Sequence, residues 1–248
     1  MSVETKTDHG EAATGGLGKG DDTALRRTAR VTGGWYLLLG IVGLLGFVIV
    51  RPRLHVDGEP AATLANLVGN AGLARIGLVL ELGLVTAQAV TAVWFYRLFR
   101  PANPNAAWSI AGFGLMNSAA VLISAVFMTT AFAVASDPGL APNGDAAATV
   151  QLLFEMSKNS WGVGALFFGL WLIPMGHAAA GSGLMPLWLG RILMIGGVGY
   201  VLSAFLSYGL TSPSPWLIEG LVVPATIGEF WMIGYLLVVG VRRPPRVG

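Results

Sequence analysis

Six apolar stretches constrain the fold of this chain more than any other feature of its sequence. They cover residues 31–50, 76–96, 106–134, 146–176, 184–210 and 221–241. Each is close to or longer than the roughly 20 residues that a helix needs to cross the hydrocarbon core of a bilayer. Because the stretches are continuously apolar rather than alternating, and a backbone in lipid must satisfy its own hydrogen bonds, they do not fit a β-barrel. The sequence predicts an all-α polytopic membrane protein with a bundle of six transmembrane helices.

The composition argues against a soluble enzyme and against a nucleic-acid-binding protein. Hydrophobic residues make up 54% of the 248 residues and charged residues only 11%, whereas about a quarter of the residues in soluble domains are charged. The net charge is only +2, without the basic and aromatic surface that binds phosphates. The chain contains no cysteine, which removes disulfides, thiolate metal sites and iron–sulfur clusters from consideration.

The chain divides into three predicted segments. Residues 1–27 are expected to form a disordered cytoplasmic tail, residues 28–241 the six-helix transmembrane domain, and residues 242–248 a basic cytoplasmic tail. Most lysines and arginines fall in the tails or in loops on the same side, whereas Arg51, Arg53 and Arg75 fall on the opposite side. Cytoplasmic segments are enriched in these residues. Both termini are therefore predicted to be cytoplasmic.

Ionisable residues within the apolar stretches form the candidate substrate or proton site. They are Glu81, Glu155, Lys158 and Glu229. Such residues are costly inside a bilayer and often belong to solute or proton pathways. Each glutamate lies eight positions from the expected outer end of its helix, which corresponds to a depth of about 12 Å. The spacing predicts one acidic layer in which Lys158 neutralises one carboxylate.

Three polar residues, Gln88, Asn117 and Asn159, are expected to support this site. Gln88 lies on the same helical stripe as Glu81, and Asn159 on the same face as Glu155. A competing interpretation is that the buried charges only hold helices together. Asn117 and Ser124 are expected to form interhelical hydrogen bonds, and Trp161 lies deep enough either to line a cavity or to pack between helices.

The histidine positions argue against metal and haem chemistry. His9 lies in the tail, His55 in the outer loop and His177 at the inner end of the fourth helix. No cluster of histidines and carboxylates is expected at one depth, so we expect no metal, no cofactor and no enzyme. A lipid-directed intramembrane enzyme with a glutamate base is a third hypothesis, but no partner for that base can be named.

Short motifs along the chain follow the order of a known family. They are Ala74-Arg75-Ile76-Gly77, Tyr96-Arg97-Leu98-Phe99-Arg100-Pro101, Phe167-Phe168-Gly169-Leu170, Pro186-Leu187-Trp188-Leu189-Gly190, Gly199-Tyr200, and Pro224 with Gly228-Glu229. Over about residues 28–241 the chain resembles the bacterial membrane family catalogued as domain of unknown function 4386 (DUF4386). The resemblance implies a six-helix protein of the bacterial cytoplasmic (inner) membrane, without an established activity. It includes Glu229, and it departs from the family pattern after Glu155, where Lys158 and Asn159 stand in place of a histidine.

Two functions follow as hypotheses from these residues. The first is a small-solute or proton-coupled carrier that uses the mid-membrane acids, with a small polar or cationic solute as the possible partner beside the lipid bilayer. The alternative is a non-catalytic membrane sensor or scaffold whose buried charges serve helix packing. Homo-oligomers are possible in either case, and nucleic acid is not an expected partner.

Overall fold

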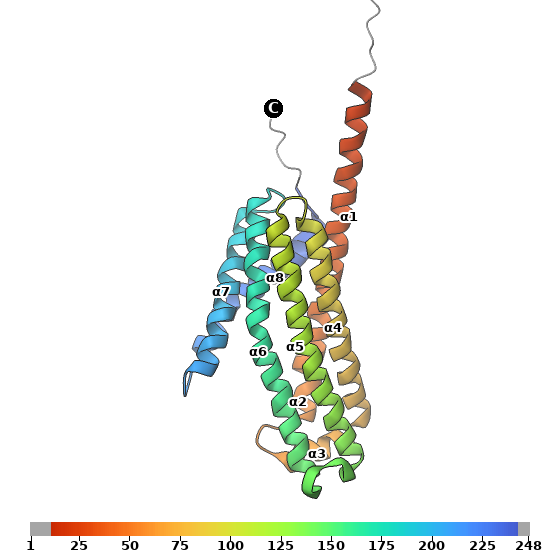
Figure 1. Ribbon diagram of the computed structural model, residues 1–248, viewed down its shortest axis with the longest axis vertical. Coiled ribbons are helices and arrows are strands. Elements are labelled where there is room, and N and C mark those ends of the chain that lie inside the picture. Colours follow the sequence, from red (N-terminus) through yellow and green to blue (C-terminus); the bar gives the residue numbers. More distant parts are fainter. Residues whose placement is uncertain (1–10, 243–248) are drawn as a thin grey trace, which may run out of the picture.

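The computed structural model of the chain describes residues 11–242, and every regular element in that range is helical (Figure 1). The elements in chain order are α1 (Glu11–Gly43), the π-helical segment η1 (Leu44–Val50), α2 (Arg51–Leu54), α3 (Pro60–Gly69), α4 (Ala71–Phe99), α5 (Pro104–Ser136), the 3-10 turns η2 (Pro138–Leu140) and η3 (Pro142–Gly144), α6 (Ala146–Gly181), α7 (Leu187–Gly209) and α8 (Pro215–Val238).

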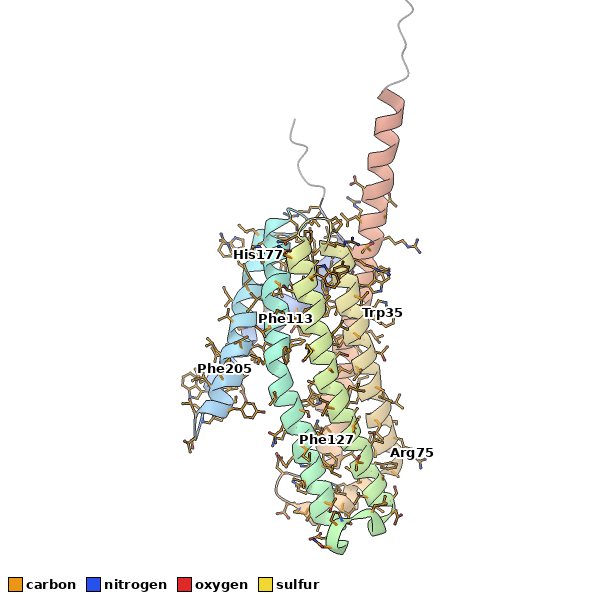
Figure 2. The ribbon with its side chains drawn as sticks, in the orientation of Figure 1. Trp35, Arg75, Phe113, Phe127, His177 and Phe205 are labelled. Atoms are coloured by element: carbon orange, nitrogen blue, oxygen red, sulfur yellow. The ribbon has the colours of Figure 1, made fainter. Side chains whose placement is uncertain are left out.

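Six helical stretches of the described chain are long and apolar enough to cross a membrane. The first runs from Asp22 through η1 to Leu54, and the others are α4, α5, α6, α7 and α8. Less than half of each span is buried inside the protein. Large apolar side chains such as Val79 and Phe230 are instead exposed, as is Phe205, which points away from the bundle in Figure 2. Such outward-facing apolar side chains are expected of helices in lipid. The prediction of an all-α bundle with six spans is confirmed.

The six spans form a closed arrangement. Each of α4 to α7 packs against the next helix in the sequence, and α1 contacts both α4 and α8. The helices α2 and α3 lie at the same end of the bundle as the α5–α6 connection, which we call the α3 end (Figure 1). The α7–α8 connection stops short of this end and lies closer to the middle of the bundle (Figure 1). The α3 end is therefore built mainly from α2 to α6.

Local signals in the sequence explain where several helices begin. The side chain of Asn103 accepts a hydrogen bond from the backbone N–H of Ala106, and Pro104 occupies the first position of α5. Asp145 caps α6 in the same way, accepting from the N–H of Ala148. Both side chains satisfy a backbone donor that the helix itself leaves free. The connection between the second and third spans is correspondingly short, since α4 ends at Phe99 and α5 begins at Pro104.

The N-terminal segment differs from its prediction. Helix α1 begins at Glu11, so residues 11–27 are helical where the sequence suggested a disordered tail. Adding a residue to an existing helix costs less than starting a new one, so the first span can extend through this proline-free segment. Residues 1–10 and 243–248, and with them most of the predicted C-terminal tail, lie outside the described part of the chain. Arg242 lies within it, and its N–H donates to the carbonyl of Leu184.

Glycines allow α7 to approach both of its neighbours closely. A Cβ atom added at Gly197 would lie 2.7 Å from the carbonyl oxygen of Gly169 on α6. A Cβ atom added at Gly196 would overlap the backbone of Ala225 on α8. These close helix contacts are the kind that small residues permit in membranes.

Candidate functional site

The predicted acidic layer is wrong, because the three glutamates lie in three different environments. Glu155 lies at the α3 end, where it faces His55. Glu81 lies within the bundle and accepts hydrogen bonds from Ser124 and Trp161. Glu229 lies still further from the α3 end, paired with Tyr36 of α1.

The separation of Glu81 and Glu229 follows from the contacts of the first span. Leu80, next to Glu81, packs against Gly46, whereas Glu229 contacts Tyr36. Tyr36 precedes Gly46 by ten residues, which corresponds to about 15 Å along a helix. The depth prediction failed because α8 begins at Pro215 rather than at residue 221, and because this start already lies towards the middle of the bundle (Figure 1).

A hydrogen-bonded network crosses four helical segments around Glu81. The Arg51 guanidinium donates to Ser157 Oγ at 3.0 Å, Ser157 and Ser124 are 2.7 Å apart, and Ser124 Oγ donates to Glu81 Oε1 at 2.5 Å. A serine hydroxyl has one proton, so Ser157 must donate to Ser124. Each group from Arg51 to Ser124 thus donates to the next, and the last acceptor is the Glu81 carboxylate. Hydrogen bonds that are aligned in this way strengthen one another.

The two serines of the network are fully buried, and this gives a testable stability effect. Ser124 and Ser157 both have 0% exposure. Ser124→Ala removes one donor to Glu81 and is expected to lower the free energy of unfolding by about 1–3 kcal/mol. Thermal unfolding in detergent, followed by tryptophan fluorescence, measures the change. Ser136→Ala is the matched control on α5, because the exposed Ser136 only bonds back to the carbonyl of Phe132; equal losses in the two variants would contradict the network.

Arg51 is the site residue that the sequence analysis missed. The first apolar stretch ends at Val50, so Arg51 was assigned to the outer loop. In the structure the helix continues through η1, and the Arg51 N–H bonds to the carbonyl of Gly46, five residues back. π-Helical turns of this kind often occur at functional sites. The guanidinium lies 5.4 Å from the ring centre of Phe47 and also approaches the carbonyl of Phe154, so it points into the bundle.

A cavity of about 50 Å³ adjoins this network. Its walls come from α1, η1 and every helix from α2 to α6, and they are mostly apolar, with Arg51 and Glu81 as the charged side chains. Trp161 also lines it and donates through Nε1 to Glu81 Oε1 at 3.3 Å. Both roles considered for Trp161 are observed, because its ring also packs against Phe47 of η1 with the ring centres 5.3 Å apart. A volume of this size holds water or part of a small solute.

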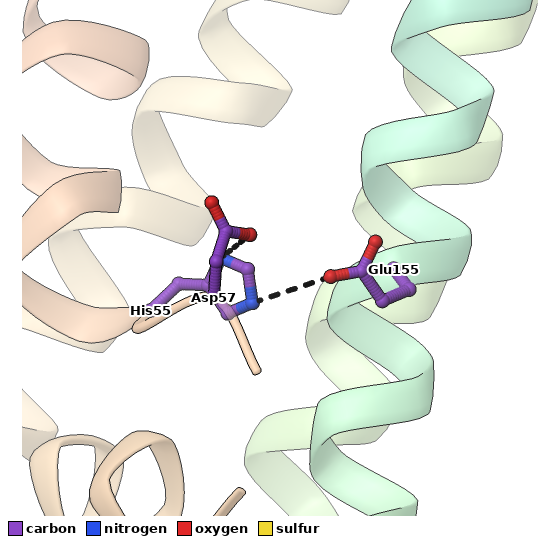
Figure 3. A group of neighbouring side chains, drawn as sticks. All are labelled: His55, Asp57 and Glu155. Atoms are coloured by element: carbon purple, nitrogen blue, oxygen red, sulfur yellow. Dashed lines mark ion pairs between the residues drawn. The ribbon is translucent and has the colours of Figure 1, made fainter. Parts of the chain in front are cut away.

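A second polar cluster lies at the α3 end, where the loop after α2 meets α6 (Figure 3). His55 Nδ1 is 3.7 Å from Asp57 Oδ1, and His55 Nε2 is 3.8 Å from Glu155 Oε1. Lys158 Nζ lies 3.1 Å from Asp57 Oδ1 and 3.9 Å from Glu155 Oε2. The expectation that no histidine and carboxylates converge is wrong, because potential ligand atoms of His55, Asp57 and Glu155 all lie within 4.8 Å of one another.

The environment of this cluster sets the charge of its members. Burial lowers the pKa of the His55 imidazole below its ordinary value, although the carboxylate of Asp57 acts in the opposite direction. The hydrogen bond from Lys158 lowers the pKa of the Asp57 carboxyl. At neutral pH the imidazole is therefore neutral and Asp57 ionised. The His55 ring also stacks on Phe154, with the ring centres 4.8 Å apart.

Glu229 has a different kind of partner. The Tyr36 hydroxyl donates to Glu229 Oε1 at 2.5 Å, which links α1 to α8. Tyr36 is almost fully buried, and its ring meets Phe95 and Trp171 edge-on at 5.3 and 5.5 Å. The carboxylate thus lies beside an aromatic core, at a level of the first span about 15 Å from that of Gly46.

The three polar residues that were expected to support the acidic site lie apart from one another. Gln88 is buried on α4 and donates weakly to the carbonyl of Gly114 at 3.5 Å. Asn117 is buried on α5, opposite Gly164 of α6. Asn159 is exposed, so it does not complete the Glu155 site. The interhelical bonding expected of Ser124 is confirmed by its contacts with α4 and α6.

The fold and the outward-facing apolar side chains define a multi-pass α-helical membrane protein. The chain belongs to the DUF4386 family, whose description is "Domain of unknown function (DUF4386)" and whose profile matches residues 31–240. An uncharacterised protein of the archaeon Archaeoglobus fulgidus is 26% identical over 125 residues, or 50% of this chain and 63% of that protein. The chain therefore matches less than two thirds of this relative's length. No solved structure matches the chain.

Proposed function

We propose that the chain is a carrier for a small solute with an apolar body and a polar or charged end, and that the cavity beside Arg51 and Glu81 is its binding site. The observation that carries the proposal is the placement of two opposite charges on the wall of an otherwise apolar cavity within the membrane-spanning bundle. Binding sites for small molecules commonly combine apolar walls with a few fixed polar groups.

The polar groups beyond the cavity support access from the α3 end. Ser157, which bonds to Arg51, lies two residues from Glu155 on α6. The hydrogen-bonded side chains run from Arg51, the first residue of α2 at the α3 end, through Ser157 and Ser124 to Glu81. The serine hydroxyls both donate and accept, so the same path suits proton movement coupled to the solute. From the positive-inside rule we infer that the chain lies in a prokaryotic cytoplasmic membrane with the α3 end outside and both termini in the cytoplasm.

The test compares solute binding and uptake in matched variants. We expect the purified protein to gain thermal stability with one of three probes, namely glycine betaine, choline or putrescine, and proteoliposomes to take up the same probe. Glu81→Gln and Arg51→Gln are each expected to reduce uptake at least about tenfold, because each removes one of the charges that orient the solute. A pH-sensitive dye trapped in the vesicles reports accompanying proton movement.

Exposed residues of the same types provide controls. Glu219→Gln and Arg53→Gln make the same chemical changes at exposed positions, and both are expected to transport like the wild type. The carrier proposal would be refuted if none of the probes entered faster than into protein-free vesicles, or if Glu81→Gln left uptake unchanged.

A non-catalytic sensor or scaffold is the second candidate, and one observation favours it. The Tyr36–Glu229 hydrogen bond joins the first and last spans beside a packed aromatic core. A buried acid in this position can serve helix association alone. Neither proposal assigns a catalytic step to the acids.

A further inference from the structure

The cluster at the α3 end contains a second site, separate from the solute cavity. His55 and Asp57 come from the loop that follows α2, and Glu155 comes from α6 (Figure 3). The cavity wall includes neither His55, Asp57 nor Glu155. The cluster therefore needs its own explanation.

The distances between the His55 nitrogens and the carboxylate oxygens fit side chains that surround a position for an ion. The His55 nitrogens lie 3.7 and 3.8 Å from carboxylate oxygens, beyond the 2.7–3.2 Å of an ordinary hydrogen bond. Two ligands about 2.0–2.1 Å from a tetrahedral metal ion are roughly 3.3 Å apart. The side chains of Asp57 and Glu155 are 73% and 40% exposed, so small rotations can close the remaining gap.

Lys158 shows where a positive charge is favoured. Its ammonium group contacts both Asp57 and Glu155, while its side chain is 54% exposed. The two carboxylates therefore converge on a cation that belongs to the chain itself. A long lysine side chain can leave such a position for water at little cost, and a dissolved cation can then replace it.

The histidine is held more firmly than the carboxylates. The side chain of His55 is 9% exposed, its ring stacks on Phe154, and its Nε2 lies 3.2 Å from Gln151 Nε2. Among the described residues, the other amide atom, Gln151 Oε1, is buried without a hydrogen-bond partner. The His55 ring is therefore held in position beside the Gln151 amide, whose oxygen can still accept a hydrogen bond.

We propose that His55, Asp57 and Glu155 bind a divalent transition-metal ion of the zinc type, in competition with the ammonium group of Lys158. One imidazole with two carboxylates suits zinc, whereas magnesium and calcium prefer sites made of oxygen alone. Such an ion would fasten the loop after α2 to α6. The site does not depend on the carrier proposal.

The experiment titrates zinc into the full-length protein, purified through a tag without histidine, in competition with a chromophoric chelator. Lys158→Met is expected to tighten zinc binding at least about tenfold, because the competing ammonium group is removed. His55→Gln is expected to weaken it by about tenfold or more. A gain of affinity in Lys158→Met cannot result from misfolding, so the test is valid even if another variant is unstable.

The exposed His177 provides the matched control. His177→Gln is expected to bind zinc like the wild type, and an excess of magnesium is expected to leave binding unchanged. If His55→Gln bound zinc as tightly as the wild type, the proposed site would be wrong. If Lys158→Met did not bind zinc more tightly, Lys158 would not compete with the ion. If magnesium displaced zinc, the preference for a zinc-type ion would be wrong. Solute uptake in Glu81→Gln is measured separately, so failure of either proposal is recognised independently.

Discussion

Replacing Gly196 by alanine is expected to disrupt the packing of α7 on α8 and to lower stability by about 3 kcal/mol or more. The added methyl group would overlap backbone atoms of Ala225. A backbone cannot rotate away as a side chain can, so the two helices would have to separate. In a membrane this separation also removes the close van der Waals contact that drives helix association.

A matched glycine on α8 shows whether the effect is local. Nothing lies within 4 Å of the position that a Cβ atom would take at Gly234. Gly234→Ala is expected to keep or slightly raise stability, because alanine favours helix by up to about 1 kcal/mol over glycine. Thermal unfolding in detergent and the yield of monodisperse protein measure both variants. Equal unfolding temperatures for Gly196→Ala and Gly234→Ala would contradict the observed approach of α7 and α8.

The fold was predictable because its main determinant is local. Stretches of about 20 apolar residues can be recognised without knowledge of their neighbours, and in lipid they must become helices. The caps Asn103 and Asp145 mark two helix starts in the same local way.

The candidate site was less predictable because it depends on relative depth and on the path of a loop. The single acidic layer required three helices to begin at one level, but the start of α8 at Pro215 lies towards the middle of the bundle (Figure 1). Arg51 follows the first apolar stretch directly, and only the continuation of the helix turns it inwards. Spacing along the sequence cannot show that His55 and Asp57 fold back to Glu155, because 98 residues separate Asp57 from that glutamate.

Removing the hydroxyl of Tyr36 tests whether Glu229 holds the bundle together. Tyr36→Phe keeps the ring against Phe95 and Trp171 but deprives the Glu229 carboxyl of its donor. We expect the free energy of unfolding to fall by about 1–3 kcal/mol, the cost of an unpaired polar group. Tyr208→Phe is the control, because Tyr208 is 56% exposed, and its unfolding temperature is expected to equal that of the wild type.

A double-mutant cycle separates this structural role from a role in transport. Combining Glu229→Leu with Tyr36→Phe tests whether the Tyr36–Glu229 hydrogen bond is the main contribution of Glu229 to stability. If it is, the double variant will lose less free energy of unfolding than the two single variants together, with a coupling energy of about 1–2 kcal/mol. Glu229→Gln can still accept from Tyr36 through its amide oxygen, so a packing role predicts near-normal stability and uptake for that variant. Stable Glu229→Gln protein that had lost proton-coupled uptake would instead place Glu229 on the transport path. Glu229 contacts Tyr36 and the neighbour of Glu81 contacts Gly46, two positions about 15 Å apart along the first span. Such a path would therefore have to extend from the cavity to the aromatic core around Tyr36.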